Sequence, residues 1–349
     1  MNIKTIYQKN YKRKILSIIQ IILMTIFSFY LSKIAFAWPI PDSGQTKCYN
    51  DNGNEIPCPK PGEDFYGQDG NYIINPPSYT KLDENGNSLP DSALSWVMIK
   101  DNVTGLIWEV KTDDDSVHDK NNKYNWQDAQ DVFIPELNNA NFGGNSDWRI
   151  PNIYELASIA NLSKFYPAID EQYFNNYVSD LYWSSTTDAY NTDYAWGMYF
   201  SYGYDSSLHK SSAYYVRAVR SGQSRSFDNL VINNDDTITD TYTGLMWQVE
   251  TSDRKTWKDG LKYCEDLKLA DYDDWRLPSR EELRSIDYNR YFLAIYEDVF
   301  HNTMSGFYWS STTSADYTGG AWGMDFSYGD DGGYGKSSAY YVRAVRSGQ

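Results

Sequence analysis

Histidines, serines, carboxylates and tyrosines are the side chains of this sequence that could take part in chemistry. The three histidines, His118, His209 and His301, do not recur at matching positions when the two halves of the chain are aligned. No His and Cys residues have zinc-ligand spacing, and no Gly-x-Ser-x-Gly motif marks a nucleophilic serine. The tract Gly332–Ser337 ends like a phosphate-binding loop, but its first glycine is misplaced. We therefore expect no enzymatic activity and keep a metal-assisted enzyme as the lesser alternative.

Oxygen-rich loops are the feature that could bind a cofactor. Acidic and Asn-rich stretches at 83–87, 113–115, 271–274 and 330–331 offer the hard oxygen ligands that calcium prefers. None of them has a complete calcium-loop pattern, and solvated acidic loops explain the same residues. We expect no cofactor and keep calcium as an alternative, without assigning metal ligands.

The chain is internally duplicated. Lys336–Gln349 repeats Lys210–Gln223 without a change. Further motifs recur in the same order, and each repeat is about 125 residues long, the size of an independent domain. We predict two tandem domains, at 96–223 and 224–349. The recurring motifs are Asp101–Trp108 with Asp240–Trp247, Asp147–Pro151 with Asp274–Pro278, Tyr182–Thr187 with Tyr308–Thr313, and Ala195–Met198 with Ala321–Met324.

Candidate binding residues come from comparing the repeats. Tyr182–Gln223 aligns with Tyr308–Gln349 over 42 positions, and the 11 differences fall between unchanged segments. The changed positions are rich in Tyr, Asp, Asn, Ser and Gly, which are typical of adaptable recognition surfaces. We predict that these loops bind a ligand, and unconstrained surface drift remains the alternative. The candidates are Asp188, Tyr190, Asn191, Asp193, Tyr194, Tyr199, Tyr204, Ser206, His209, Asp316, Tyr317, Asp325, Asp330 and Tyr334.

Helices and strands must hold these loops in place. Apolar residues from Trp126 to Leu137 and from Trp257 to Leu267 have helical spacing, and Cys264 falls on the buried face as an inert thiol. A second helix in each repeat starts with a capping pattern, Asn152 with Glu155 and Ser279 with Glu282. Strands are predicted at Tyr182–Trp183, Trp196–Tyr202 and Tyr214–Val219, and at the matching positions of the second repeat. The fold class is therefore α+β with a mainly antiparallel, aromatic-rich sheet in each domain.

The repeated motifs resemble those of a bacterial family. Asp-x-x-Thr-Gly-Leu-x-Trp, Asp-Trp-Arg-(Ile/Leu)-Pro, Tyr-Trp-Ser-Ser-Thr and Val-Arg-Ala-Val-Arg, each present twice, are similar to the Lcl C-terminal domain, named after a Legionella collagen-like adhesin. The resemblance implies adhesion, including adhesion to sulfated polysaccharide. More distantly, Arg276–Pro278, Glu282 and Val342–Arg343 resemble the C-type-lectin-like core of formylglycine-generating enzymes, which implies two lectin-like domains. The late pair of cysteines that those enzymes require is absent.

The N-terminus indicates export. Five basic residues precede the apolar run Ile15–Tyr30, which predicts a signal peptide at 1–37, and an uncleaved membrane anchor is the alternative. Because 1–37 contains six Lys or Arg and no Asp or Glu, its removal changes the net charge from −16 to −22. Such a negative protein repels nucleic acid and anionic membranes. In an oxidising compartment Cys48 and Cys58 are expected to form a disulfide that pins an irregular segment, 38–95.

Together these observations predict a secreted, periplasmic or surface-associated binding protein. Its expected partner is a glycan or a surface protein, and its charge disfavours a polyanion. It is not expected to insert into a membrane after signal cleavage. A structural envelope module without a small ligand is the main alternative, and the ligand and the oligomeric state are left open.

Overall fold

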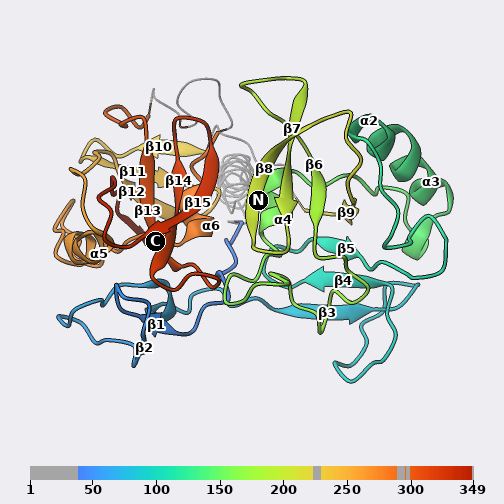
Figure 1. Ribbon diagram of the computed structural model, residues 1–349, viewed down its shortest axis with the longest axis horizontal. Helices are drawn as coiled ribbons and strands as arrows, with labels where there is room; N and C mark the ends of the chain where they lie inside the picture. Colours follow the sequence, from blue (N-terminus) through green and yellow to red (C-terminus); the bar gives the residue numbers. More distant parts are fainter. Residues whose placement is uncertain (1–37, 223–228, 289–294, 296–298, 348–349) are drawn as a thin grey trace, which may run out of the picture. The chain divides into compact units, whose positions relative to one another are not determined.

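The computed structural model describes residues 38–349 except 223–228, 289–294, 296–298 and 348–349 (Figure 1). The predicted signal segment therefore lies outside the described residues. Within the described part of the chain, no helix is long and apolar enough to cross a membrane. Residues from Trp38 onward form one compact unit, and both repeats lie within it.

Each repeat contains a four-stranded antiparallel sheet. In the first repeat, β3 (Tyr79–Leu82), β4 (Met98–Asp101), β5 (Ile107–Glu109) and β9 (Val219–Arg220) lie in that order. The second repeat has the same order in β10 (Leu230–Ile232), β11 (Thr237–Asp240), β12 (Leu245–Gln248) and β16 (Val345–Ser347). The repeated Val-Arg-Ala-Val-Arg tail thus returns the chain to the sheet from which its repeat begins.

Each repeat also contains a three-stranded antiparallel sheet of consecutive strands. These strands are β6 (Leu181–Thr187), β7 (Tyr194–Tyr199) and β8 (Tyr204–His209) in the first repeat. Their counterparts are β13 (Phe307–Thr313), β14 (Gly320–Asp325) and β15 (Asp330–Gly335) (Figure 1). The chain is therefore mixed α+β and mostly β, in two tandem domains, as the sequence predicts.

The first helix of each repeat starts where the sequence places it. Asn125 and Thr256 cap the helices by accepting the main-chain N–H of the third residue beyond them. In the second repeat this helix is α5 (Trp257–Glu265). In the first repeat, α2 (Trp126–Asp128) continues through a π-helical turn, 129–133, into α3 (Ile134–Asn139). Pro135, which lacks a main-chain N–H and cannot donate an i→i−4 hydrogen bond, lies in the first turn of α3 just after this π turn.

The second helix of each repeat carries a complete capping box. In α4 (Ile153–Ala157) Asn152 and Glu155 cap each other's main chain, and in α6 (Arg280–Arg284) Ser279 and Glu282 do the same. Each glutamate also forms an ion pair with the arginine of the preceding Asp-Trp-Arg motif. Arg149 Nη2 and Arg276 Nη2 each lie 2.6 Å from a carboxylate oxygen of Glu155 and Glu282, respectively. The recurring arginines and glutamates therefore have structural roles.

The recurring tryptophans fill the cores. Trp108, Trp183, Trp247, Trp257, Trp275 and Trp309 are fully buried. Cys264 is buried beside Trp257 as expected, and burial raises the pKa of its thiol. Large aromatic side chains contribute much of the apolar area that each small domain buries. The recurrence of these buried tryptophans thus reflects packing.

The segment 38–95, expected to be irregular, contains three short strands. The disulfide Cys48–Cys58 is present, and it links β1 (Cys48–Tyr49) to the chain just beyond β2 (Glu55–Ile56). The strand β3 pairs with β4 and so belongs to the first repeat's sheet. In the second repeat β10 pairs with β11 in the same way. Each structural repeat therefore begins one strand before the first motif that the two repeats share in sequence.

The predicted strands differ from the structure in two places. Tyr204–His209 forms β8, although its changed residues were expected to lie in a loop. Tyr214–Val219 was expected to be a strand, but only its end joins β9, and Tyr214 and Tyr215 form isolated bridges. Gly197 of β7 allows the close approach of β6, because a Cβ at this position would lie 2.7 Å from the Tyr182 carbonyl oxygen.

Candidate functional site: an aromatic crevice between the repeats

The edge strands β8 and β15 bring the two repeats together. The main-chain N–H of Asp205 donates to Oδ1 of Asp331 at 3.0 Å, and the N–H of Asp331 donates to Oδ1 of Asp205 at 3.2 Å. These aspartates occupy matching positions of the two repeats, so the contact is nearly symmetric. Both side chains are buried. The changed residues on either side of each aspartate are therefore held at the boundary between the repeats.

Two arginines of α6 neutralise this buried acidic pair. Arg284 bonds to both Asp205 and Asp331, and Arg280 bonds to Asp331. Burial raises the pKa of Asp205, which the Arg284 guanidinium partly offsets, whereas Arg284 and Arg280 hold the pKa of Asp331 below its usual range. The first repeat has Ile153 and Ala157 at the matching positions, so the second repeat supplies both cations.

A crevice opens beside this contact, with a volume of about 410 Å³. Such a volume falls within the range of small-molecule sites. The first repeat contributes Tyr202 and Tyr204, and the second contributes the loop after β13 and the strand β15. The lining residues are Tyr202, Tyr204, Ser314, Asp316, Tyr317, Trp322, Asp331, Gly332 and Gly333.

One wall of the crevice belongs to a cluster of tyrosines. The rings of Tyr202 and Tyr204 are stacked, with centroids 6.3 Å apart, and Tyr199 packs against both. Tyr166 packs on the edge of Tyr202, with a centroid distance of 5.8 Å. Burial is the main factor that raises the pKa of Tyr204, and the neighbouring tyrosines and aspartates add to the shift. The Tyr204 hydroxyl therefore stays neutral and available as a hydrogen-bond donor.

The other wall combines an exposed ring with polar groups. Tyr317 is 59% exposed, and the exposed carboxylate Asp316 precedes it. Trp322 is buried to 4% exposure, and its indole Nε1 has no hydrogen-bond partner among the described residues. The crevice thus contains flat aromatic faces and an exposed carboxylate.

The residues that correspond to the crevice lining when the two repeats are exchanged also form a contact between the repeats. Tyr328, which matches Tyr202, packs on the edge of Tyr190, with ring centroids 5.9 Å apart. Both rings are more than half exposed. The turn between β7 and β8 of the first repeat therefore lies near the loop after β13 of the second. Likewise, the turn between β14 and β15 of the second repeat contacts the loop after β6 of the first.

Other predicted binding residues lie outside the crevice. Asp188 is buried, where it accepts the Ser207 hydroxyl and the main-chain N–H of Tyr190, so it shapes its loop and is not exposed to a ligand. Tyr194 and His209 pack together across β7 and β8, at 5.1 Å. Tyr334 packs on Phe307 at 4.5 Å. Asp193 and Ser206 have no place in the crevice lining, and Asn191 lies exposed beside Tyr190.

Asp325 and Asp330 replace two aromatic residues of the first repeat. They face each other across β14 and β15, where the first repeat pairs Tyr199 with Tyr204. The same hairpin end therefore carries two rings in one repeat and two carboxylates in the other. This difference gives the two pseudo-symmetric contacts different chemical character.

Several site residues are missed by sequence comparison. Tyr202 and Trp322 are identical in the two repeats, so a search for differences passes over them. Arg280 and Arg284 lie on α6, whose many charged residues are typical of a solvent-exposed helix. Their replacement by Ile153 and Ala157 in the first repeat is the signal that could have found them.

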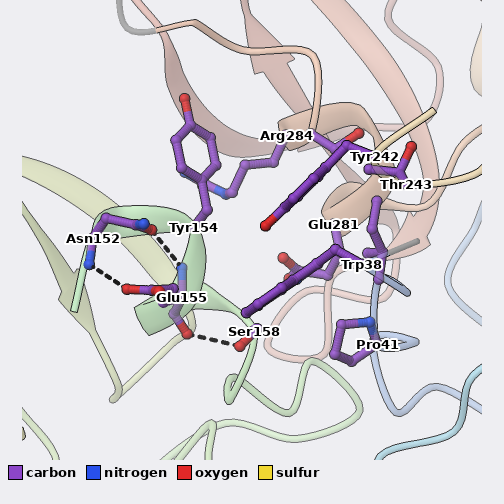
Figure 2. A pocket seen from close by; sticks show the side chains of 12 residues that line it. Trp38, Pro41, Asn152, Tyr154, Glu155, Ser158, Tyr242, Thr243, Glu281 and Arg284 are labelled. Atoms are coloured by element: carbon purple, nitrogen blue, oxygen red, sulfur yellow. Dashed lines mark hydrogen bonds between the residues drawn. The ribbon is translucent and has the colours of Figure 1, made fainter. Parts of the chain in front are cut away.

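A second, narrow cavity lies between α4 and α6. Figure 2 shows Trp38 and Tyr242 with parallel rings, and their centroids are 5.9 Å apart. Tyr154, Glu281 and Arg284 also line this cavity, whose volume is about 50 Å³. The Tyr154 hydroxyl donates across the repeats to the Asp287 carbonyl. This cavity is too small for a sugar ring, and we regard it as part of the contact between the repeats.

In two of the oxygen-rich loops, a carboxylate accepts hydrogen bonds from main-chain N–H groups nearby in the sequence. Asp83 accepts the main-chain N–H groups of Asn85 and Asn87, and Asp119 accepts those of Asp114 and Asp115. Among the described residues, no group of three or more His, Cys, Asp or Glu side chains is placed to hold a metal ion.

Comparison with known proteins identifies the repeats. The family model of the Lcl C-terminal domain matches residues 97–220 and 236–346, which together make up more than half of the chain. No curated protein sequence matches the chain. Both matched regions carry the repeated motifs, and the first strand of each four-stranded sheet, β3 or β10, lies just before them. The chain therefore belongs to the family of the Lcl C-terminal domain, of which it contains two tandem copies.

Proposed function

We propose that this chain is an exported, non-catalytic adhesion protein that binds a neutral glycan in the crevice between its repeats. The family suggests an adhesin-like role. The observation that carries the proposal is the convergence of changed residues from both repeats, Tyr204 from the first and Asp316 and Tyr317 from the second, on one crevice. Unconstrained drift gives no reason for such convergence.

The groups that line the crevice suit a sugar. Apolar faces of sugar rings pack on flat aromatic side chains, and Tyr204 and Tyr317 offer such faces from opposite repeats. Hydroxyl groups of a sugar can donate to the Asp316 carboxylate and accept from the Tyr204 hydroxyl.

Charge favours a neutral ligand over a sulfated one. The crevice carries Asp316 and the buried Asp331, and the charge of the residues that follow the signal segment is −22. The arginines near the crevice, Arg280 and Arg284, are already paired with buried carboxylates. No lysine or arginine lines the described crevice. A polyanion would therefore meet repulsion without a compensating cation.

We extend the proposal to the fold and the location. Two small antiparallel sheets with two helices in each repeat support a C-type-lectin-like domain. The disulfide Cys48–Cys58 supports an oxidising compartment, such as the periplasm or the cell exterior. Recognition through aromatic rings and hydrogen bonds requires no cofactor.

A glycan array tests the proposal with the compact unit 38–349, in calcium and in chelator. We expect binding of one or more neutral glycans in both conditions, and a Tyr204→Ala/Tyr317→Ala variant should lose at least tenfold in affinity. Tyr334→Ala is the matched control, since this ring lies on β15 outside the crevice lining. Absence of binding to any glycan would favour a structural module. Equal loss in the control variant would place the ligand elsewhere.

A further inference from the structure

The N-terminal segment covers one face of the second repeat. We call residues 43–72 the strap, and we define the strap face by Trp257, Arg276, Thr312, Thr318 and Lys336. The Thr312 hydroxyl donates to Oδ2 of Asp69 at 2.6 Å, and the Thr318 hydroxyl donates to the Gly53 carbonyl at 2.8 Å. The Lys336 ammonium group donates to the Asn50 carbonyl at 3.3 Å. The strap is thus held by polar contacts along its length.

Two aromatic rings of the strap complete this cover. Tyr72 lies beside the Arg276 guanidinium at 5.3 Å, and its hydroxyl donates to Glu265 at 2.6 Å. Tyr49 lies 5.7 Å from the Lys336 ammonium group. As a result Trp257, Thr312 and Lys336 are at most 1% exposed.

The first repeat contains the same face. Its matching residues are Trp126, Arg149, Thr186, Thr192 and Lys210. Lys210 lies 4.0 Å from the Trp126 ring, as Lys336 does from the Trp257 ring. Each lysine also donates at 2.9 Å to the hydroxyl of a matching threonine, Thr187 or Thr313. The two faces are therefore built alike.

No segment of the described residues covers the face of the first repeat in the same way. Trp126, Thr186 and Lys210 are partly exposed, and Thr192 is exposed. The Arg149 side chain is 38% exposed, against 6% for Arg276. A partly exposed tryptophan beneath a lysine, flanked by threonine hydroxyls and an arginine, offers both apolar area and hydrogen bonds.

The strap of this chain is already committed to the second repeat. It is closed by the Cys48–Cys58 disulfide, and it also bridges the repeats, because the Gln45 side chain donates to the Leu162 carbonyl at 3.0 Å and bonds to Thr313. The described chain thus presents two similar faces and one strap. Among the described residues no second segment of this kind lies over the first face, so we take its covering segment from another polypeptide.

We propose that the strap face of the first repeat is a docking site for a strap-like peptide segment of a partner protein. The segment carries a carboxylate for the Thr186 hydroxyl, a main-chain carbonyl for Thr192, and an aromatic ring beside Lys210. These are the groups that Asp69, Gly53 and Tyr49 supply on the second repeat. One contact would be missing, because Gln127 stands where Lys258 pairs with Asp64 at 2.6 Å.

A disulfide-closed synthetic peptide of residues 43–72 is the probe for this site. Labelled peptide is titrated with the compact unit 38–349 and followed by fluorescence polarisation. We expect saturable binding of one peptide per chain. Thr192→Arg and Lys210→Glu should each weaken this binding about tenfold, and Thr192 is exposed, so its replacement leaves the fold intact.

The matched control for charge is Lys268→Glu, an exposed lysine outside both faces, which should bind the peptide like the wild type. A peptide with Asp69→Asn and Tyr49→Ala should bind weakly. No saturable binding by the wild-type chain would overturn the proposal. Binding that Thr192→Arg and Lys210→Glu leave unchanged would overturn it as well, since the peptide would then occupy another surface.

Discussion

At the scale of single residues, burial decides what a repeated side chain does. Arg149 and Arg276 make the same bidentate contact with a helix-capping glutamate, yet one is partly exposed and the other is covered by Tyr72. Exposed ion pairs contribute little because water competes for both partners, whereas a buried carboxylate that loses its partner is strongly destabilising. The repeats therefore offer an internal comparison of one interaction in two environments.

We predict that Arg276→Ala lowers the free energy of unfolding by about 3–5 kcal/mol, because it leaves the Glu282 carboxylate buried beneath the strap without a cation. Arg149→Ala should lower it by less, because water can enter the partly exposed space left by the Arg149 side chain and solvate the buried Glu155 carboxylate. Urea unfolding of the two variants, measured in one buffer, gives both values. Equal losses would show that the strap does not bury the second pair in solution.

Asp69 predicts a pH dependence of stability. Burial raises its pKa to about 6 from 3.8, against the opposing effect of the Ser43 and Thr312 hydroxyls. Between these values the folded protein binds a proton that the unfolded chain has released, so stability falls as pH rises from about 4 to about 6. The contribution is about 2–3 kcal/mol.

The Asp69→Asn variant isolates this contribution because asparagine does not titrate. We expect the difference in unfolding free energy, wild type minus variant, to decrease between pH 4 and pH 6.5 and then to stay constant. Unfolding curves of both proteins across this range measure it. A difference that rises with pH would mean that the folded state holds Asp69 ionised.

At the scale of elements, the sequence predicts helices better than strands. Helix starts at Asn125, Thr256 and Ser279 follow from capping chemistry, which acts locally. The edge strands β8 and β15 are missed because Tyr204–His209 and Asp330–Gly335 share few residue types and the second is rich in glycine. Their pairing is decided by β7 and β14 and by the contact between Asp205 and Asp331, which no local pattern shows.

The strap is an element whose stability depends on one covalent link. Closing the loop between Cys48 and Cys58 reduces the entropy of the unfolded chain by an amount equivalent to about 3 kcal/mol. We predict that a Cys48→Ser/Cys58→Ser variant loses about this much, and that proteolysis then cuts first within 43–72. Limited proteolysis with mass spectrometry locates the cut. A first cut in the second repeat's own sheets would contradict this role of the disulfide.

At the scale of the whole molecule, one charge cluster couples the repeats. Arg280 and Arg284 are within reach of aspartates from both repeats, and all of these groups are buried. The two tandem domains predicted from the sequence are confirmed by the family match, whereas the candidate loops remain a prediction as ligand-binding residues. Loops of the two repeats meet where this cluster joins the domains. Of the predicted ligand-binding residues, only Tyr204, Asp316 and Tyr317 line the crevice. Tyr202 and Trp322 also line it, but they are identical in the two repeats, so a search for differences between the repeats cannot find them.

We predict that the wild-type compact unit unfolds in a single calorimetric transition. An Arg280→Ile/Arg284→Ala variant, which copies the first repeat's residues, leaves Asp205 and Asp331 facing each other without cations. It should show two transitions with the first at lower temperature. A single transition at an unchanged temperature would mean that other contacts couple the repeats.

The central claim is that the crevice between the repeats is the ligand site, and affinity for a glycan identified on an array tests it most directly. Isothermal titration compares the wild type with Tyr204→Ala in the first repeat and Tyr317→Ala in the second. We predict one site per chain and a loss of at least tenfold from either substitution, because both walls contact the same sugar. Two sites per chain, or a loss from only one substitution, would show that each repeat binds on its own and would contradict the shared crevice.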